Sequence, residues 1–438
     1  MLVQFSVENY MTFRNKATLS LVASNYDRKT REAENVIREE QFKLRLLRSA
    51  AIYGANASGK TKLLEALLFV RNFILTSSKE GQNGDTIDVE PFRLNEESER
   101  APSEFEVIFC AANKLYRYGF SVNKERVCEE WLYFKSARKE IEVFVREGEQ
   151  IHIHDKHFQR GKYLWESKMV RNNALFLSVA AQFNEDMAGE VLDWFRNLKI
   201  ISGLRREGFE SFTFSQITDL GFKETLLRLS QAADIALEDI EIKQDKPEEH
   251  LPKELVEHLR QQNPNAVFYH DLNTFHKKFD AQGNLLKERA VFSFNENESA
   301  GTQQFFSIAG PIIDVLAHGY LLYVDELDAC LHPRLVSALV ALFNSAQSNP
   351  RNAQLIFNTH YSQLLDTGLL RRDQIWFVEK NEWEEGALYS LSDFKGIRKN
   401  EPFQRNYLLG RYGAVPIIED FTNVVYNEKY DEEKQEAW

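Results

Sequence analysis

Apolar and polar residues alternate in two stretches within residues 1–22, and this pattern predicts two half-buried strands. Residues 49–53 form a short apolar run that leads into glycine-rich sequence, which is typical of a buried strand. Residues 60–75 then carry leucine, valine and isoleucine at helical spacing. The sequence therefore predicts a strand, a loop and a helix in direct succession.

The hydrophobic pattern changes in the middle of the chain. Short alternating runs separated by polar turns predict antiparallel strands, which we assign to a β subdomain over residues 101–164. Residues 165–265 are more helical, and we expect a helical insertion there. Its clearest helical segments are 187–198, 222–233 and 252–262.

Strands and helices alternate in the last third of the chain. After a hairpin predicted over residues 267–294, the expected elements are a helix at 302–316, a strand at 320–324, a helix at 333–346, and strands at 354–357 and 374–378. This alternation implies a parallel sheet. We therefore assign residues 1–100 and 266–400 to the two parts of one α/β core, and residues 401–438 to a C-terminal tail.

Composition and charge narrow the class of protein. The chain has 438 residues, of which 43% are hydrophobic and 27% are charged, as expected for a folded protein larger than one hydrophobic core. The net charge of -12 argues against nonspecific nucleic-acid binding, although a local basic groove would be compatible with it. Because the sequence contains no heptad run, we expect no long coiled-coil arm.

The cysteines and the apolar runs bear on the cellular compartment. The three cysteines are widely separated, which argues against a disulfide framework or a zinc knuckle and favours a reducing environment. No stretch approaches the roughly 20 apolar residues that a membrane helix needs, and the first residues lack the pattern of a signal peptide. We therefore expect a cytoplasmic protein with no membrane partner.

Residues Gly54–Thr61 match the phosphate-binding pattern GxxxxGK[ST] in full, and they lie between a predicted strand and a predicted helix as this motif requires. Glycines let the backbone curl around a phosphate, and the helix N-terminus holds negative charge. Lys60 would reach the β- and γ-phosphates, and Thr61 would ligate Mg²⁺. The residues expected to hold the nucleotide are Gly54, Asn56, Ala57, Ser58, Gly59, Lys60, Thr61 and Lys62. The predicted cofactors are ATP and Mg²⁺.

Asp325 and Glu326 follow the strand predicted at 320–324, at the end where α/β sheets place their ligands. An acidic pair after a strand is by itself more often part of a solvated loop. With Lys60 upstream, we interpret the pair as a Walker B motif. In this motif Asp325 would bind Mg²⁺ and Glu326 would orient or deprotonate the attacking water.

His360 lies just beyond the strand predicted at 354–357, where ABC ATPases place a switch histidine against the γ-phosphate. A lone histidine is more often structural, but together with the phosphate-binding loop and the Walker B pair we expect His360 to sense the γ-phosphate. Lys60, Glu326 and His360 are therefore the candidate catalytic residues.

Ser299 and Gly301 open the helix that precedes Asp325, where ABC proteins carry a signature that contacts the γ-phosphate bound to the other subunit. The fit to the signature sequence LSGGQ is loose, and the same residues would also serve as an N-cap serine and a glycine turn with a purely structural role. Their position favours binding in trans, and residues 327–333 follow as a D-loop candidate. No Q-loop is evident, because Gln82 lies in a polar stretch.

The order of these motifs resembles the RecF, SMC and OLD branch of ABC ATPases, in which the opening segment Val7–Arg14 would lie near the adenine. Several longer strings look like the RloA or AbiL-type ATPases of bacterial phage defence, and they span nearly the whole chain. These strings are residues 53–61, 114–120, 130–132, 324–333, 357–360 and 410–416.

The resemblance implies an α/β fold with an ABC-type P-loop ATPase core that works as a homodimer or higher homo-oligomer. It also implies an abortive-infection role in which the ATPase controls a separate effector of the TOPRIM-like or RloB type. Because 78 residues follow His360, too few for a nuclease domain as well, we expect that effector on another chain.

Other interpretations stay open. A DNA-repair or chromosome-organising ATPase of the RecF and SMC kind would show coiled-coil arms or a basic face, and the sequence shows neither. A scaffold that binds ATP without hydrolysing it would not need Glu326 and His360. The acidic residues 417–438 are either a solvated terminus or a partner-docking segment.

Overall fold

The structure is a computed structural model of the chain. It describes residues 1–136, 138–202, 207–244, 257, 269–398 and 401–418. Apart from residue 257, the helix predicted at 252–262 lies outside these described residues, and so does most of the acidic tail, from 419 onward. No helix in the described part of the chain is both long and apolar enough to span a membrane.

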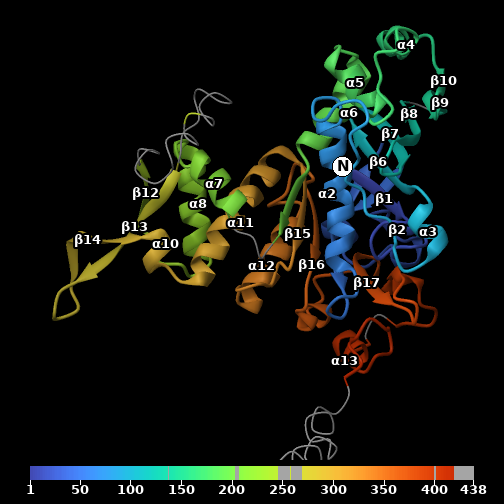
Figure 1. The fold of residues 1–438 in the computed structure, drawn as a ribbon. Coiled ribbons are helices and arrows are strands. Elements are labelled where there is room, and N and C mark those ends of the chain that lie inside the picture. The colour runs from blue at the N-terminus through green and yellow to red at the C-terminus, as the bar shows by residue number, and fades with distance from the viewer. Residues whose placement is uncertain (137, 203–206, 245–256, 258–268, 399–400, 419–438) are drawn as a thin grey trace, which may run out of the picture.

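A six-stranded sheet forms the centre of the molecule (Figure 1). Its strands, in spatial order, are β11 (Lys199–Ser202), β15 (Leu321–Asp325), β16 (Gln354–Asn358), β5 (Ser49–Tyr53), β17 (Ile375–Lys380) and β18 (Gly386–Ser390). Neighbouring strands run parallel except β17 and β18, which are antiparallel. The predicted parallel sheet is therefore confirmed. Strand β16 lies between β5, which leads into the phosphate-binding loop, and β15, which ends in the acidic pair.

A second, seven-stranded sheet is antiparallel. Its strands, in spatial order, are β10 (Gln150–Ile153), β9 (Glu140–Glu147), β8 (Val127–Lys135), β7 (Lys114–Val122), β6 (Ser103–Ala111), β1 (Leu2–Glu8) and β2 (Ala17–Ser20). This sheet extends beyond the β subdomain predicted over residues 101–164, because β1 pairs with β6 over Leu2–Glu8 and belongs to it. Gln354 joins the two sheets, since its side chain accepts from the Leu2 amide at 2.6 Å and donates to the Leu2 carbonyl at 3.0 Å.

Helix α2 (Lys60–Thr76) lies between the two sheets (Figure 1). Its buried residues, among them Leu67 and Val70, share one apolar core with Phe120 of the antiparallel sheet and Ile356 of the parallel sheet. Burial of apolar surface on both sides holds this helix against lateral displacement. The loop that precedes α2 is therefore fixed between two packed layers.

The other face of the parallel sheet is covered by α11 (Ala300–His318) and α12 (Pro333–Phe343). Helices α7 (Glu207–Gln216) and α8 (Leu220–Ala232) pack against α11. Beside them lie α10 (Phe294–Asn297) and a three-stranded sheet of β12 (Asp239–Gln244), β13 (Tyr269–Phe279) and β14 (Leu285–Ser293), whose last two strands project at the left of Figure 1.

The predicted helical insertion at 165–265 is not one unit. Helices α5 (Phe176–Gln182) and α6 (Asp186–Arg196) pack against α2, whereas α7 and α8 belong to the lobe around α11. Between them β11 joins the parallel sheet beside β15. This strand was missed because it has four residues, too few for a period to show among amphipathic helices. The remaining elements are α1 (Glu32–Asn35), β3 (Val36–Glu39), β4 (Leu44–Leu47), α3 (Glu96–Arg100), α4 (Gln159–Glu166) and α13 (Phe403–Leu408).

Candidate functional site

The phosphate-binding loop connects β5 to α2, as predicted. A Cβ atom on Gly54 would lie 2.4 Å from the Val378 carbonyl oxygen and 2.6 Å from Ser58 Oγ, so only glycine fits there. Gly59 has a φ of 113°, and Ala57 has a φ of 59°. The loop therefore turns through left-handed backbone that glycine adopts without strain. Its amide groups are placed at the start of α2, where anions bind in many proteins.

Gly54→Ala is expected to destabilise the loop and to weaken ATP binding, because the new methyl group would overlap the Val378 carbonyl. Strain of this kind typically costs about 1–3 kcal/mol. The melting temperature and ATP affinity of the purified variant measure the two effects. Gly189→Ala is the control, since this glycine lies in α6 and its Cβ would meet nothing within 4 Å. Equal ATP affinity in the Gly54 variant would contradict the assigned geometry.

Lys60 begins α2 and is 6% exposed. Its ammonium group donates hydrogen bonds to the carbonyl oxygens of Gly54 and Ala55, both at 2.9 Å. Burial lowers the pKa of Lys60, while the nearby carboxylates of Asp325 and Glu326 oppose that shift. The cation is thus held at the mouth of the loop by two carbonyl groups that phosphate oxygens can replace.

Asp325 and Glu326 lie at the end of β15, where they were predicted. Asp325 is 3% exposed and accepts a hydrogen bond from the Asn358 side chain at 2.5 Å. The Asn358 amide oxygen in turn accepts from the Tyr323 hydroxyl at 3.2 Å, so β15 and β16 orient the carboxylate together. Glu326 has a φ of 52°, an uncommon conformation for a residue other than glycine, and its side chain turns into the cavity beside Lys60.

His360 follows β16 and faces the same cavity. Its backbone N–H donates to both carboxylate oxygens of Asp328, at 3.2 and 3.3 Å, and the preceding Thr359 amide donates to the Ile52 carbonyl. Burial, followed by the charge of Lys60, lowers the pKa of His360 below its usual range. The imidazole is therefore neutral near pH 7 and can both donate and accept a hydrogen bond.

A cavity of about 480 Å³ brings most of the predicted residues together. Its lining from the predicted set is Asn56, Ala57, Ser58, Gly59, Lys60, Thr61, Lys62, Glu326 and His360. Gly54 and Asp325 do not line it; the Gly54 carbonyl accepts from Lys60, and Asp325 directly precedes Glu326 at the end of β15. The Thr61 hydroxyl and the Asp325 carboxylate are the hard oxygen donors that Mg²⁺ prefers, so the residues present fit this ion and a nucleotide triphosphate.

Two residues of the cavity were not among the predicted site residues, although Thr12 lies in the segment Val7–Arg14 that the resemblance places near the adenine. Thr12 contributes from the turn after β1; its carbonyl accepts from the Gly386 amide at 2.8 Å, and its methyl group would lie 3.1 Å from a Cβ on Gly59. Lys380 contributes from the end of β17 and pairs with Glu384 at 2.7 Å. Lys380 lies at the carboxyl end of a predicted parallel strand, where α/β sheets place their ligands, and this position could have indicated its place in the site.

Ser299 and Gly301 do not line this cavity. Ser299 is the exposed N-cap of α11, and its hydroxyl accepts from the Thr302 amide at 3.1 Å. Gly301 faces the D-loop candidate, because a Cβ there would lie 3.2 Å from the Cys330 carbonyl oxygen. The signature candidate at Ser299 and Gly301 and the D-loop candidate at 327–333 are therefore neighbours. Their action on the nucleotide of the other subunit stays a prediction. Gln82, the residue considered for a Q-loop, is exposed and donates its backbone N–H to Asp85.

The parallel sheet, the loop at Lys60 and the acidic pair after β15 define a P-loop ATPase fold of the α/β class. The model of the family described as "AAA domain, putative AbiEii toxin, Type IV TA system" matches residues 49–366. This match covers most of the chain and all of the motifs from Gly54 to His360, so the protein belongs to that family.

Two solved structures are similar to the chain at low identity. One is the SMC head domain from Thermotoga maritima, with 11% identity, a TM-score of 0.41, and coverage of 89% of this chain and 98% of that chain. The other is cbiO1 from Clostridium perfringens, described as part of the ABC transporter complex cbiONQ, with 10% identity, a TM-score of 0.30, and coverage of 87% and 95%. No curated protein matches the chain in sequence.

Proposed function

We propose that this protein is an ABC-type ATPase that binds ATP and Mg²⁺ between two subunits and hydrolyses ATP to ADP and phosphate. The observation that carries the proposal is the cavity shared by Lys60, Thr61, Glu326 and His360. Lys60 neutralises charge on the β- and γ-phosphates, and Thr61 and Asp325 hold Mg²⁺, which supplies further charge neutralisation.

Glu326 positions a water molecule for attack on the γ-phosphorus and accepts its proton as the bond to ADP breaks. His360 donates a hydrogen bond to the γ-phosphate, which its neutral imidazole allows. The general base, the histidine and the lysine of this step therefore already lie around one cavity.

The proposal of a dimer is supported by the separation of Ser299 and Gly301 from their own chain's Lys60 cavity. Both lie at the exposed N-terminus of α11, a helix of 19 residues, where amide groups and the helix dipole favour a phosphate. In a two-fold dimer, each N-terminus reaches the nucleotide of the other subunit. ATP then acts as a bridge, and its hydrolysis releases the two chains.

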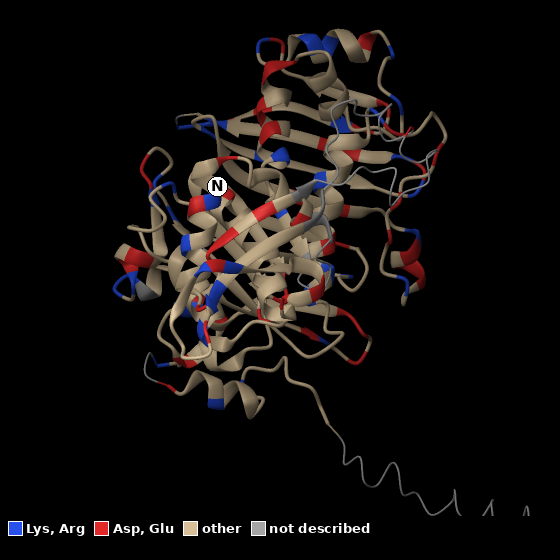
Figure 2. Ribbon diagram, turned by 90° about the vertical axis from the view of Figure 1, so that its left-hand side faces the viewer, with Lys and Arg blue, Asp and Glu red and all other residues tan. Residues whose placement is uncertain are grey.

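We further propose that this cycle makes the protein a cytoplasmic sensor or regulatory ATPase of an abortive-infection defence system, with a separate effector. The family description, which names a toxin of a Type IV toxin–antitoxin system, supports the defence role. The alternative is a DNA-repair or chromosome-organising ATPase. Figure 2 shows acidic and basic residues interspersed over the elements in that view, and salt-dependent DNA binding by the ATP-bound protein would favour the alternative.

A mixture of two inactive variants tests the shared site. Lys60→Ala prevents nucleotide binding by the loop of its own chain. Ser299→Arg blocks the surface that contacts the nucleotide bound to the partner chain. Their heterodimer contains one site with both changes and one intact site, so mixing equal amounts should restore about a quarter of wild-type phosphate release for random pairing. Lys60→Ala mixed with Glu326→Gln is the control, because no intact site can form. Equal activity in both mixtures would contradict a role for Ser299 in trans.

A further inference from the structure

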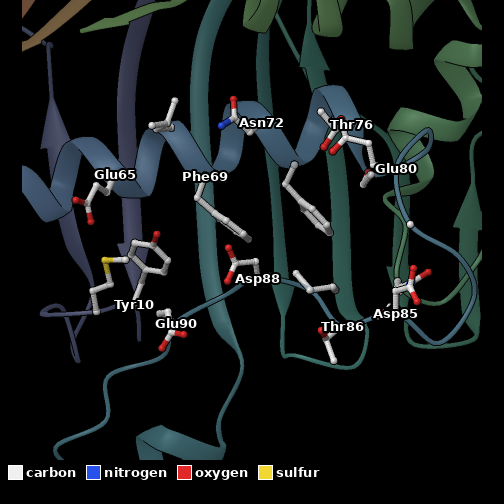
Figure 3. Close-up of a pocket in the computed structure, with 17 residues that line it drawn as sticks. Tyr10, Glu65, Phe69, Asn72, Thr76, Glu80, Asp85, Thr86, Asp88 and Glu90 are labelled. Atoms are coloured by element: carbon white, nitrogen blue, oxygen red, sulfur yellow. Dashed lines mark hydrogen bonds between the residues drawn. The ribbon is translucent and has the colours of Figure 1, made fainter. Parts of the chain in front are cut away.

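A second cavity, of about 490 Å³, lies along α2 beyond the nucleotide site (Figure 3). We call it the α2 groove. One wall is the side of α2 from Glu65 to Thr76 with the turn that follows it, which includes Glu80, and the facing wall is the segment from residue 85 to residue 90. Tyr10 and Met11, from the turn after β1, close the end nearest the start of α2. Neither the proposed hydrolysis nor the family match explains this groove.

The wall formed by α2 presents an aromatic surface. Phe69 and Phe73 stack with ring centroids 5.5 Å apart and an interplanar angle of 11°, and the ring of Tyr10 lies 5.8 Å from that of Phe69. Both phenylalanines are only half-buried, and Figure 3 shows Phe69 projecting from α2 toward Asp88. Covering these rings with an apolar side chain would remove more apolar surface from water and stabilise a complex.

The rim of the groove is acidic. Its carboxylates are Glu65, Glu80, Asp85, Asp88 and Glu90. Among the described residues, no lysine or arginine lines the groove. Glu65 pairs with Lys62 at 2.7 Å and Glu90 pairs with Arg93, whereas Glu80 and Asp88 form no ion pair within the described part of the chain.

The negative field of this rim acts on the aromatic surface as well. Burial raises the pKa of Tyr10, and the carboxylates of Glu65, Asp88 and Glu90 raise it further. A phosphate-rich ligand would be repelled here, and a purely apolar ligand would leave carboxylates poorly solvated. The complementary ligand carries cations at its edges and a large apolar group between them.

The groove is joined to the nucleotide site by one short turn. Tyr10 and Met11 line the groove, while the next residue, Thr12, lines the nucleotide cavity. The Met11 amide donates to the Glu90 carbonyl at 2.8 Å, which ties this turn to the facing wall. Helix α2 itself begins at Lys60 and continues along the groove.

We propose that the α2 groove docks a basic, amphipathic segment of another protein, with an apolar side chain on Phe69 and Phe73 and lysine or arginine side chains against Glu80 and Asp88. This docking does not depend on ATP hydrolysis. Identifying the docked protein with the separate effector rests on the proposed function, and in that case docking lies one turn away from the nucleotide.

A labelled peptide of lysine and leucine, added to the full chain without nucleotide, tests the groove by fluorescence anisotropy. We expect saturable binding that weakens with added salt. The double variant Glu80→Lys and Asp88→Lys should weaken it by about tenfold or more, because both exposed carboxylates become repulsive. The matched control, Glu149→Lys with Glu166→Lys, makes the same change in net charge at exposed sites outside the groove lining and should bind the peptide as the wild type does.

Three outcomes would overturn the proposal. In the first, the groove variant binds the peptide as tightly as the wild type. In the second, a matched peptide with serine in place of leucine binds equally well. In the third, spermine displaces the peptide completely and the leucine content has no effect. Circular dichroism and the melting temperature of each variant establish that it is folded. Because no ATP is present, failure here leaves the ATPase proposal intact, and loss of ATPase activity in Glu326→Gln leaves docking intact.

Discussion

Replacing Glu326 with glutamine is expected to lower steady-state ATP hydrolysis by about 10²- to 10⁴-fold, the usual contribution of a general base. Glutamine keeps the size and the hydrogen-bonding shape of the side chain, but its amide cannot accept the proton of the attacking water. Lys60 and Thr61, which hold the nucleotide and its ion, are unchanged. ATP binding should therefore remain close to that of the wild type while turnover stops.

The same variant should accumulate as an ATP-bound dimer, because hydrolysis is the step proposed to separate the chains. Light scattering of the eluted protein with and without ATP measures the mass, and released phosphate measures turnover. Glu149→Gln removes the same charge at an exposed turn between β9 and β10 and should hydrolyse ATP normally. An unchanged rate in Glu326→Gln would show that another group activates the water.

The parts of the site that the sequence predicted are one continuous segment and two residues at the carboxyl ends of apolar strands. Gly54, Lys60 and Thr61 lie within a single strand, loop and helix, so local spacing determines their geometry. Glu326 and His360 could be predicted because each ends or follows an apolar strand, and strands of a parallel sheet present their carboxyl ends at one edge. The cavity confirms that these separate segments meet.

The remaining parts depend on which strands become neighbours, and local patterns do not contain that information. Thr12 reaches Gly59 only because the turn after β1 packs against Gly386, the first residue of β18. Lys380 reaches the loop because β17 pairs with β5. The membership of β1 in the antiparallel sheet was not predicted for the same reason, since its partner β6 lies about a hundred residues away in sequence. Long-range pairing thus decides the edges of the site and of the subdomains.

Lys60→Ala should abolish measurable ATP binding. Each hydrogen bond from a charged donor contributes about 1.5–3 kcal/mol, so losing contacts to two phosphates predicts a loss of affinity of about 100-fold or more. Stability without ATP should change little, because alanine removes both the cost of burying the ammonium and its two bonds to Gly54 and Ala55. The effect therefore lies in the ligand-bound state.

Thermal unfolding with and without ATP separates these two states in one experiment. A ligand present at 100 times its Kd stabilises a protein by about 2.7 kcal/mol, and Lys60→Ala should lose this shift while keeping the melting temperature of the free protein. Lys79→Ala, which removes an exposed lysine just beyond α2, should keep both. An ATP-dependent shift of normal size in Lys60→Ala would mean that the carbonyl-bound ammonium does not turn to the phosphates. In that case Lys62 or Lys380, the other two lysines that line the cavity, would bind them.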